Sequence, residues 1–117
     1  MIKGIGIDLV ELNRFDDKLY DAFIDRILSS EERAVFDAFK DTTRQKTYLS
    51  SRFAVKEAYT KAVQHFNTPL NFNEVSVLND AHGAPYIKSP YQPQNTLWVS
   101  LSHTHTHVVA VVVLGDA

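Results

Sequence analysis

The stretch RFAVKEAYTKA, residues 52–62, carries four charged side chains within one short segment of helical pattern. Glu57 and Lys61 lie four residues apart, as do Arg52 and Lys56, so each pair shares one side of a helix. On an exposed helix, a carboxylate and an ammonium at this spacing form an ion pair worth about 0.3–0.5 kcal/mol. An ordinary surface pair is therefore one interpretation of these residues.

The apolar residues of the same segment favour a second interpretation. Ala54, Ala58 and Ala62 form a narrow stripe of small side chains, and larger apolar residues continue on both sides of it. A helix that is apolar nearly all round is covered on more than one face, by its own sheet or by a second subunit. Charged side chains that are buried by such packing usually have specific partners. This favours a functional site for these residues.

Asp8 is the first candidate partner, because it follows Gly4 and Gly6 on one face of an expected strand. Glycine inside a strand often marks the close approach of another backbone, and a stripe of alanines is what a closely packed helix presents. Such packing would bring Asp8 near Glu57. Two carboxylates repel unless a cation lies between them, and carboxylates with substrate phosphates are the usual surroundings of Mg²⁺. A turn or helix-capping role for Asp8 is the alternative.

The hydropathy pattern predicts an α+β fold in one domain, residues 1–117. Alternating apolar residues predict a strand over 2–10, and three- and four-residue spacing predicts a helix over 11–28. A capping box from Ser29 to Glu32 opens a second helix over 29–40, and a similar box from Thr42 to Gln45 opens a third that ends near Gln64. A hairpin over 73–87 and strands over 96–102 and 107–114 complete the prediction.

Composition narrows the class of protein. The net charge is −2 and there is no cysteine, which excludes disulfides and thiolate metal sites and gives no indication of nucleic-acid binding. The longest apolar run, VVAVVVL, is too short to cross a bilayer. We therefore expect a soluble, cytoplasmic protein that binds neither membrane nor nucleic acid. Residues 40–61 nevertheless carry six Lys/Arg against two Asp/Glu, which suits either a small anionic ligand or a solvated helix face.

Three motifs, GIGIDLVEL at 4–12, RFAVKEAYTKA at 52–62 and SLSHT at 100–104, resemble the holo-acyl-carrier-protein synthase family of the 4′-phosphopantetheinyl transferases. They occur in the family's order and cover essentially the whole chain. The resemblance implies an antiparallel sheet packed on a long central helix, in a homotrimer with sites at subunit interfaces. It also implies Mg²⁺-dependent transfer of 4′-phosphopantetheine from coenzyme A to a serine of apo acyl carrier protein, for fatty acid biosynthesis, with release of adenosine 3′,5′-bisphosphate.

The resemblance assigns catalytic roles to three residues. Asp8 and Glu57 match the family's metal ligands, and Lys61 matches the lysine near the attacked phosphate. Phosphoryl transfer depends on positioning and charge neutralisation more than on covalent chemistry, and these residue types supply both.

Four further residues match binding positions of the family. Arg52 and Lys56 match basic positions that face the phosphates of coenzyme A, and His103 matches a histidine near its 3′-phosphate. Arg14, in ELNRF, matches a basic position that meets the acidic carrier protein.

The chain departs from the family pattern after Ala62, where VQHFNTPLNF replaces a glycine-rich loop. We expect this segment to turn through Asn67 and Pro69. Because its backbone is less free to cradle phosphate, an alternative function is a catalytically silent trimer that binds coenzyme A or a nucleotide. A third hypothesis is a pure interaction module.

The HTHTH sequence places His103, His105 and His107 at strand alternation. This spacing could form a metal-binding strand edge. A tight turn between the two expected strands would break that common face, so His105 and His107 are expected to belong to a surface turn.

Overall fold

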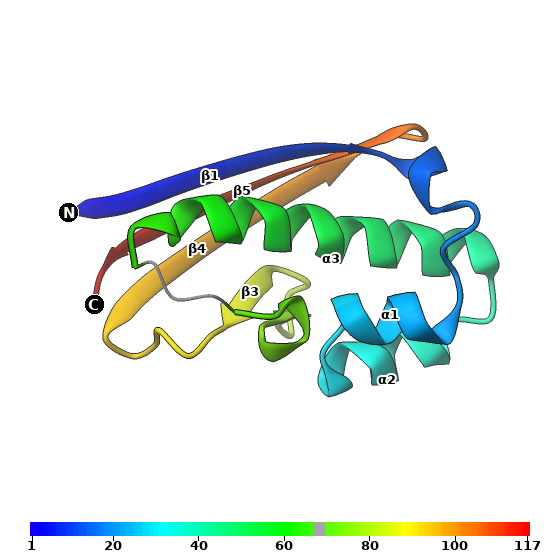
Figure 1. Cartoon of the computed structure of the whole chain (residues 1–117), viewed down its shortest axis with the longest axis horizontal. Helices are drawn as coiled ribbons and strands as arrows, with labels where there is room; N and C mark the ends of the chain where they lie inside the picture. Colours follow the sequence, from blue (N-terminus) through cyan, green and yellow to red (C-terminus); the bar gives the residue numbers. More distant parts are fainter. Residues whose placement is uncertain (67–69) are drawn as a thin grey trace.

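A computed structural model gives the structure of the chain and describes all residues except 67–69 and the side chain of His65. The order of elements is β1 (Ile2–Glu11), α1 (Asp21–Ile27), α2 (Ser30–Ala38), α3 (Thr42–Ala62), β2 (Ser76–Asn79), β3 (Pro85–Lys88), β4 (Asn95–His103) and β5 (His107–Asp116), shown in Figure 1. Short 3-10 turns lie at Leu12–Phe15 (η1), Gln64–Phe66 (η2) and Phe72–Glu74 (η3). The predicted α+β class is confirmed. The turn expected through Asn67 and Pro69 lies outside the described residues.

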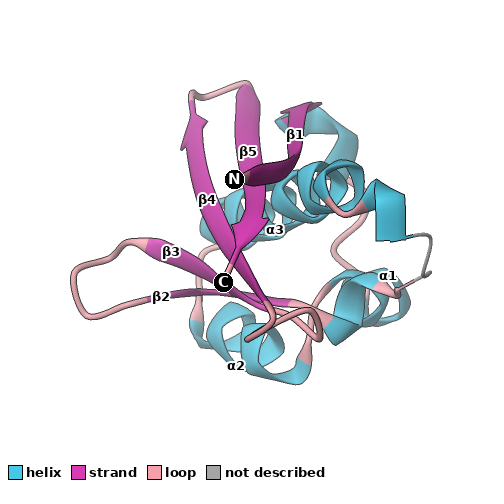
Figure 2. Cartoon of the chain, turned by 90° about the vertical axis from the view of Figure 1, so that its left-hand side faces the viewer, coloured by secondary structure: helices cyan, strands magenta, loops and turns pink. Residues whose placement is uncertain are grey.

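Strands β1, β5 and β4 form an antiparallel sheet in that order, with β5 in the middle (Figure 2). Valine is frequent in β5, and its β-branched side chain favours extended backbone. Val108, Val112 and Leu114 of β5 are fully buried and form part of the core. Strands β2 and β3 pair separately as the expected hairpin, where Gly83 donates its N–H to the carbonyl of Asp80.

Helix α3 lies between two layers (Figure 2). The three-stranded sheet covers one side, and α1, α2 and the β2–β3 hairpin lie on the other. Leu49, Val55, Ala58 and Tyr59 are buried around the helix, which explains why its sequence is apolar on nearly all sides. None of the described helices combines the length and apolar character needed to cross a bilayer.

The predicted helix over 11–28 is wrong in its first half. Glu11 still pairs with His107 in the sheet, and the N–H of Leu12 donates to the carbonyl of Thr106, so the strand continues where a helix was expected. Leu12 and Phe15 are buried through the 3-10 turn instead. The apolar residues of this segment belong to a strand end, a 3-10 turn and a short α-helix, and the α-helix is limited to Asp21–Ile27.

The two predicted capping boxes have different outcomes. The box at the start of α2 is confirmed: the N–H of Glu32 donates to Ser29 Oγ, and the N–H of Ser29 donates to Glu32 Oε1. The box at the start of α3 is wrong, because Asp41 caps that helix through the N–H of Thr43, 2.8 Å away. Gln45 donates to the carbonyl of Phe39 instead.

The face of the sheet that points away from α3 is apolar and exposed. Ile5, Val113 and Trp98 lie in one row across the three strands. Ile5 is 60% exposed, Leu9 65% and Trp98 54%. Neighbouring exposed apolar side chains of this size are typical of an interaction surface.

Candidate active site

Two glycines allow β1 to lie directly on α3. A Cβ added to Gly6 would lie 1.7 Å from the carbonyl oxygen of Ala58, and one added to Gly4 would lie 1.9 Å from that of Ala62. Only a residue without a side chain fits such an approach. The predicted packing of the glycine strand on the alanine stripe is therefore confirmed, and Asp8 lies on the same face of β1 as these glycines.

Lys61 bridges β1 and α3 beside Asp8. Its Nζ donates to the carbonyl of Ile7 at 2.8 Å and lies 3.6 Å from Asp8 Oδ1. The Lys61 side chain is about half exposed, so solvent screens this ion pair and its rupture costs little. Lys61 can therefore leave Asp8 for a more highly charged anion.

Glu57 lies one helical turn before Lys61 and next to Ala58, the residue that Gly6 contacts. It is partly buried, and within the described part of the chain its carboxylate has no hydrogen bond or ion pair. A carboxylate left without a protein partner, one helical turn from the lysine that contacts Asp8, fits a site for a hard cation such as Mg²⁺, whose remaining ligands are water and substrate phosphates. Asp8 and Glu57 are the residues that would hold it.

The structure contradicts the expected phosphate-binding role of Lys56. This side chain is 0% exposed and forms an ion pair with Glu32, which is also 0% exposed. Lys56 Nζ also donates to the carbonyls of Ile27 at 2.7 Å and Phe72 at 3.0 Å. An ammonium has three donors, and all three are used inside the protein. Sequence spacing placed Lys56 beside Glu57, but adjacent helix residues point in different directions, and Lys56 points into the core.

Arg52 and His103 come together, as expected of two residues that meet the same ligand. Both line a pocket of about 370 Å³ between the first half of α3 and the end of β4. The Arg52 guanidinium lies 4.1 Å above the ring of Tyr48 and donates to Asn79 Oδ1 at 2.6 Å. Arg52 is 6% exposed, and its other two nitrogens donate to the carbonyl of Val77 and to Ser51 Oγ, so each terminal nitrogen keeps one further N–H.

Sequence reasoning missed Arg44, which also lines this pocket. Residues 44, 48 and 52 are spaced by four, so they follow one side of α3 over two turns, and this spacing could have identified Arg44. The other lining residues are Phe39, Thr43, Thr47, Tyr48, Ser51 and Leu101. Two arginines, a histidine and several hydroxyl groups suit a phosphate group carried on a partly apolar molecule.

The two groups of residues lie at opposite edges of the sheet. Asp8 belongs to β1 and His103 to β4, and β5 separates these strands. A single chain therefore offers one half-site with two carboxylates and a lysine, and a second half-site with two arginines and a histidine.

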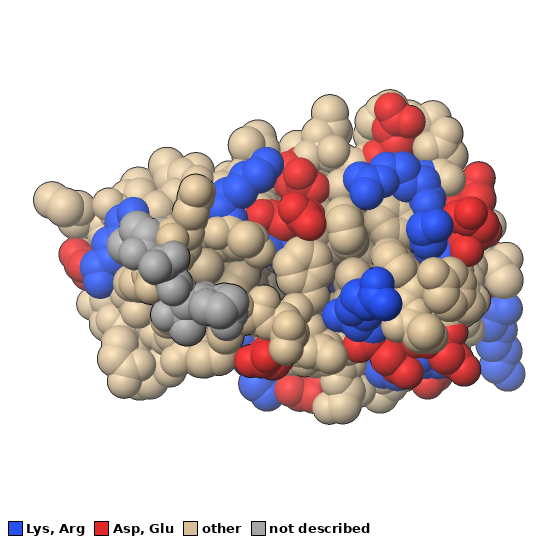
Figure 3. All heavy atoms as spheres, viewed as in Figure 1, with Lys and Arg blue, Asp and Glu red and all other residues tan. Residues whose placement is uncertain are grey.

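Arg14 is exposed beside the aromatic core, with its guanidinium 5.3 Å from the centre of the Phe53 ring. Arg14 forms no ion pair with any residue that the structure describes: Asp16 pairs with Lys46 and Asp17 with Lys18. Asp21, Asp37 and Asp25 all bind Arg33 and raise the pKa of that guanidinium. Figure 3 shows that basic and acidic side chains are interspersed on the face of the molecule that it presents. Arg14 is thus available to a partner.

The three histidines do not share one face. His103 ends β4, His107 begins β5, and His107 Nδ1 contacts Thr106 Oγ1 at 2.8 Å within the intervening turn. Among the described residues there is no group of three or more His, Cys, Asp or Glu placed to hold a metal ion.

Comparison with known proteins agrees with this geometry. A family model described as the 4′-phosphopantetheinyl transferase superfamily matches residues 4–112. The holo-[acyl-carrier-protein] synthase of Acholeplasma laidlawii is 40% identical, over 97% of both chains, and that of Oceanobacillus iheyensis is 38% identical, over 97% of both chains.

Solved structures give the same result. The holo-(acyl-carrier-protein) synthase of Bacillus anthracis, in complex with CoA (3′,5′-ADP), has a TM-score of 0.87 and 38% identity, covering 100% of this chain and 99% of that one. The enzyme from Neisseria meningitidis has a TM-score of 0.83 and 33% identity, covering 99% and 100%. The chain therefore belongs to the 4′-phosphopantetheinyl transferase superfamily, among the holo-[acyl-carrier-protein] synthases.

Proposed function

We propose that this protein transfers the 4′-phosphopantetheine group of coenzyme A to a serine of an apo acyl carrier protein. The serine Oγ attacks the pyrophosphate phosphorus that carries the pantetheine arm. The bond from that phosphorus to the bridging oxygen breaks, adenosine 3′,5′-bisphosphate leaves, and the serine loses its proton. The cytoplasmic location and the role in fatty acid biosynthesis expected from the sequence are part of this proposal.

The arrangement of Asp8, Glu57 and Lys61 where β1 meets α3 is the observation that carries the proposal. Mg²⁺ held by the two carboxylates would offset the charge that develops on the pyrophosphate. Lys61 would exchange the Asp8 carboxylate for the transferring phosphate and stabilise it electrostatically. Glu57, which has no partner in the described part of the chain, is the candidate acceptor for the serine proton.

The pocket beside Arg52 binds the nucleotide end of coenzyme A in this proposal. Arg44, Arg52 and His103 supply positive or hydrogen-bonding groups for its 3′-phosphate, and Phe39 supplies apolar surface. The similar synthase of Bacillus anthracis was crystallised in complex with CoA (3′,5′-ADP), which supports this assignment.

A homotrimer would complete the site. The two half-sites of one chain lie at opposite edges of its sheet, so one coenzyme A molecule would contact the carboxylate half of one subunit and the arginine half of the next. The apolar row of Ile5, Val113 and Trp98, in which Ile5 and Trp98 are exposed, lies on the sheet face between these edges and supports assembly through that face. Arg14 would meet the acidic carrier protein.

Intact-mass spectrometry of an apo acyl carrier protein tests the proposal. We expect incubation with coenzyme A, Mg²⁺ and this protein to add the mass of phosphopantetheine, and EDTA to prevent the addition. Asp8→Asn should abolish transfer. The matched control is Asp16→Asn, which also removes a carboxylate paired with a lysine, Lys46, but at a distant surface position, and it should transfer normally.

The silent-binder alternative is motivated by the glycine-free segment after Ala62. No mass gain with several apo carriers, alongside an active control synthase, would favour it. In that case coenzyme A should still bind, as measured by calorimetry. Absence of both transfer and coenzyme A binding would favour the third hypothesis, a pure interaction module.

A further inference from the structure

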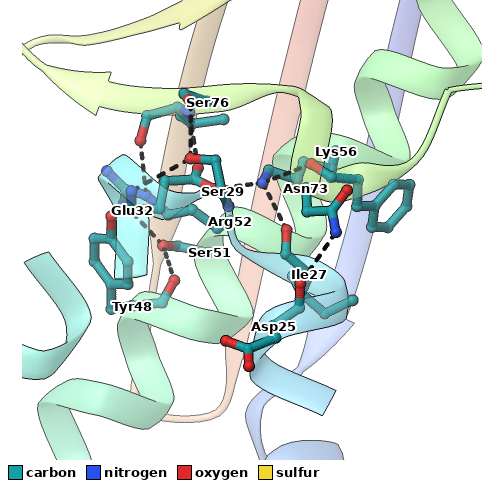
Figure 4. A network of polar contacts seen from close by, with 12 residues as sticks. Asp25, Ile27, Ser29, Glu32, Tyr48, Ser51, Arg52, Lys56, Asn73 and Ser76 are labelled. Atoms are coloured by element: carbon teal, nitrogen blue, oxygen red, sulfur yellow. Dashed lines mark hydrogen bonds and ion pairs between the residues drawn. The ribbon is translucent and has the colours of Figure 1, made fainter. Parts of the chain in front are cut away.

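Glu32 is a fully buried carboxylate whose oxygens meet three different parts of the chain (Figure 4). Oε1 accepts from the N–H of Ser29, at 2.9 Å, and from Lys56 Nζ, while Oε2 accepts from the N–H of Val77, at 2.7 Å. The capping role visible in the sequence accounts for only the first of these contacts. Glu32 thus fastens the start of α2, the middle of α3 and strand β2 to one another.

Val77 connects this carboxylate to Arg52. Its N–H donates to Glu32, and its carbonyl accepts from Arg52 Nε at 3.2 Å. Strand β2 pairs only with β3 in its two-stranded sheet, so its other edge depends on side chains to satisfy backbone groups. Glu32 and Arg52 supply the hydrogen-bond partners of the N–H and the carbonyl of Val77 on that edge. Strand β2 therefore helps to hold the Arg52 guanidinium, through Val77 and Asn79, and Glu32 ties β2 to α2.

The ion pair with Lys56 makes this attachment rigid. Lys56 also donates to the carbonyls of Ile27 and Phe72, which fixes the segments that precede α2 and β2. Burial lowers the pKa of Lys56, and the neighbouring Glu32 opposes that shift, so each charge supports the other. Moving either partner would leave an uncompensated buried charge. The high energy of such a charge keeps both side chains in place.

We propose that Glu32 is a positioning residue for coenzyme A recognition: through Val77 it helps to hold the guanidinium of Arg52, which lines the same pocket as Arg44 and His103. Glu32 is buried and touches no substrate. We expect its effect on the reaction to pass through Arg52, the residue of this network that lines the pocket. This inference rests on the proposed function, in which the pocket binds the 3′-phosphate.

The test compares coenzyme A with dephospho-coenzyme A, which lacks the 3′-phosphate. Glu32→Gln alone leaves Lys56 charged and unpaired, so a second variant, Glu32→Gln with Lys56→Met, removes both charges at nearly constant volume. The introduced glutamine offers one acceptor oxygen where the carboxylate offered two, so it cannot accept from both Ser29 and Val77. Thermal unfolding checks that each variant is folded.

For the double variant we expect KM for coenzyme A to rise about tenfold, KM for dephospho-coenzyme A to stay unchanged, and kcat to stay within about twofold. The matched control is Glu31→Gln, which removes the neighbouring carboxylate and its exposed ion pair with Lys88 of β3, and should change none of these values. In an Arg52→Ala background, the Glu32 and Lys56 substitutions should have no further effect on the preference for coenzyme A.

A general loss of kcat, an equal rise of KM for both substrates, or a full additional effect in the Arg52→Ala background would overturn the inference. Failure of the proposed function would look different, because the unmodified protein would then transfer nothing from coenzyme A. A wild-type protein that transfers but does not distinguish the two substrates would also overturn the inference, since Arg52 would then have no 3′-phosphate to meet.

Discussion

Replacing Gly6 by alanine tests whether the close packing of β1 on α3 builds the active site. The added Cβ would lie 1.7 Å from the carbonyl oxygen of Ala58 and 3.0 Å from the amide nitrogen of Ala62. Both contacts are backbone atoms of a helix buried between two layers, so neither can rotate away as a side chain would. Strand and helix would have to separate by more than about 1 Å to relieve the clash.

The expected cost is large. Overpacking a well-packed core usually costs about 1–3 kcal/mol, and a clash between rigid backbones belongs at the upper end of that range. For a domain of this size, about 3 kcal/mol corresponds to a fall of roughly 10–15 °C in Tm. The same displacement would move Asp8 and the carbonyl of Ile7 away from Lys61. A misplacement of about 1 Å near reacting groups costs about a hundredfold in rate, so activity should fall even where the variant is folded.

Thermal unfolding at fixed protein concentration and the carrier-protein mass assay measure the two effects. Gly83→Ala is the matched control: Gly83 has a φ of 84°, yet an added Cβ there meets nothing within 4 Å. That variant should lose about 1 kcal/mol from backbone strain and keep its activity. A Gly6→Ala protein with the Tm and the transfer rate of the wild type would refute the argument that the strand and helix are in contact at this glycine.

Three further substitutions each test one side chain. Glu57→Gln should abolish transfer but change the free energy of unfolding by less than about 0.5 kcal/mol, because Glu57 has no partner in the described part of the chain. Unfolding and mass assays on the same sample measure both quantities, and retained transfer would contradict the prediction. Burial raises the pKa of Tyr59 to about 12, so the folded protein keeps a proton that the unfolded chain loses above about pH 10, and stability should fall with rising pH by up to about 2–3 kcal/mol. Denaturant unfolding between about pH 9 and 12 should show a smaller fall in the free energy of unfolding for Tyr59→Phe than for the wild type, and equal falls would contradict this explanation. Ile5→Glu should give a folded but dissociated and inactive protein in sedimentation experiments, whereas Val35→Glu, at an exposed apolar position of α2, should remain assembled.

Much of the fold could be predicted because its patterns are local. The alternation of β1, the hairpin turn at Gly83 and the capping box at Ser29 each depend on residues within a few positions of one another. The helix predicted from residue 11 failed because its apolar spacing is equally compatible with a strand end, a turn and a shorter helix. Pairing between Glu11 and His107, which lie far apart in the sequence, decided between these possibilities.

The active site divides in the same way. The packing that brings Asp8 toward α3 could be inferred, because the small side chains of the glycines in β1 and of the alanines in α3 indicate that the two backbones lie close together. Lys56 could not be placed, since its partner Glu32 is 24 positions away and no periodicity connects them. A lysine beside a candidate catalytic glutamate looks functional in sequence, and only its complete burial shows that it is structural.

The order of strands in the sheet has a consequence for synthesis of the protein on the ribosome. β5 occupies the middle of the sheet, yet it is the last strand in the sequence, so β1 and β4 have no neighbour in that sheet until β5 has emerged. Such contacts between distant parts of a chain form slowly, and strand edges that are still unpaired favour aggregation. Until β5 has emerged, β1 and β4 therefore keep unpaired edges within that sheet, and the nascent chain is more prone to aggregation than the folded protein.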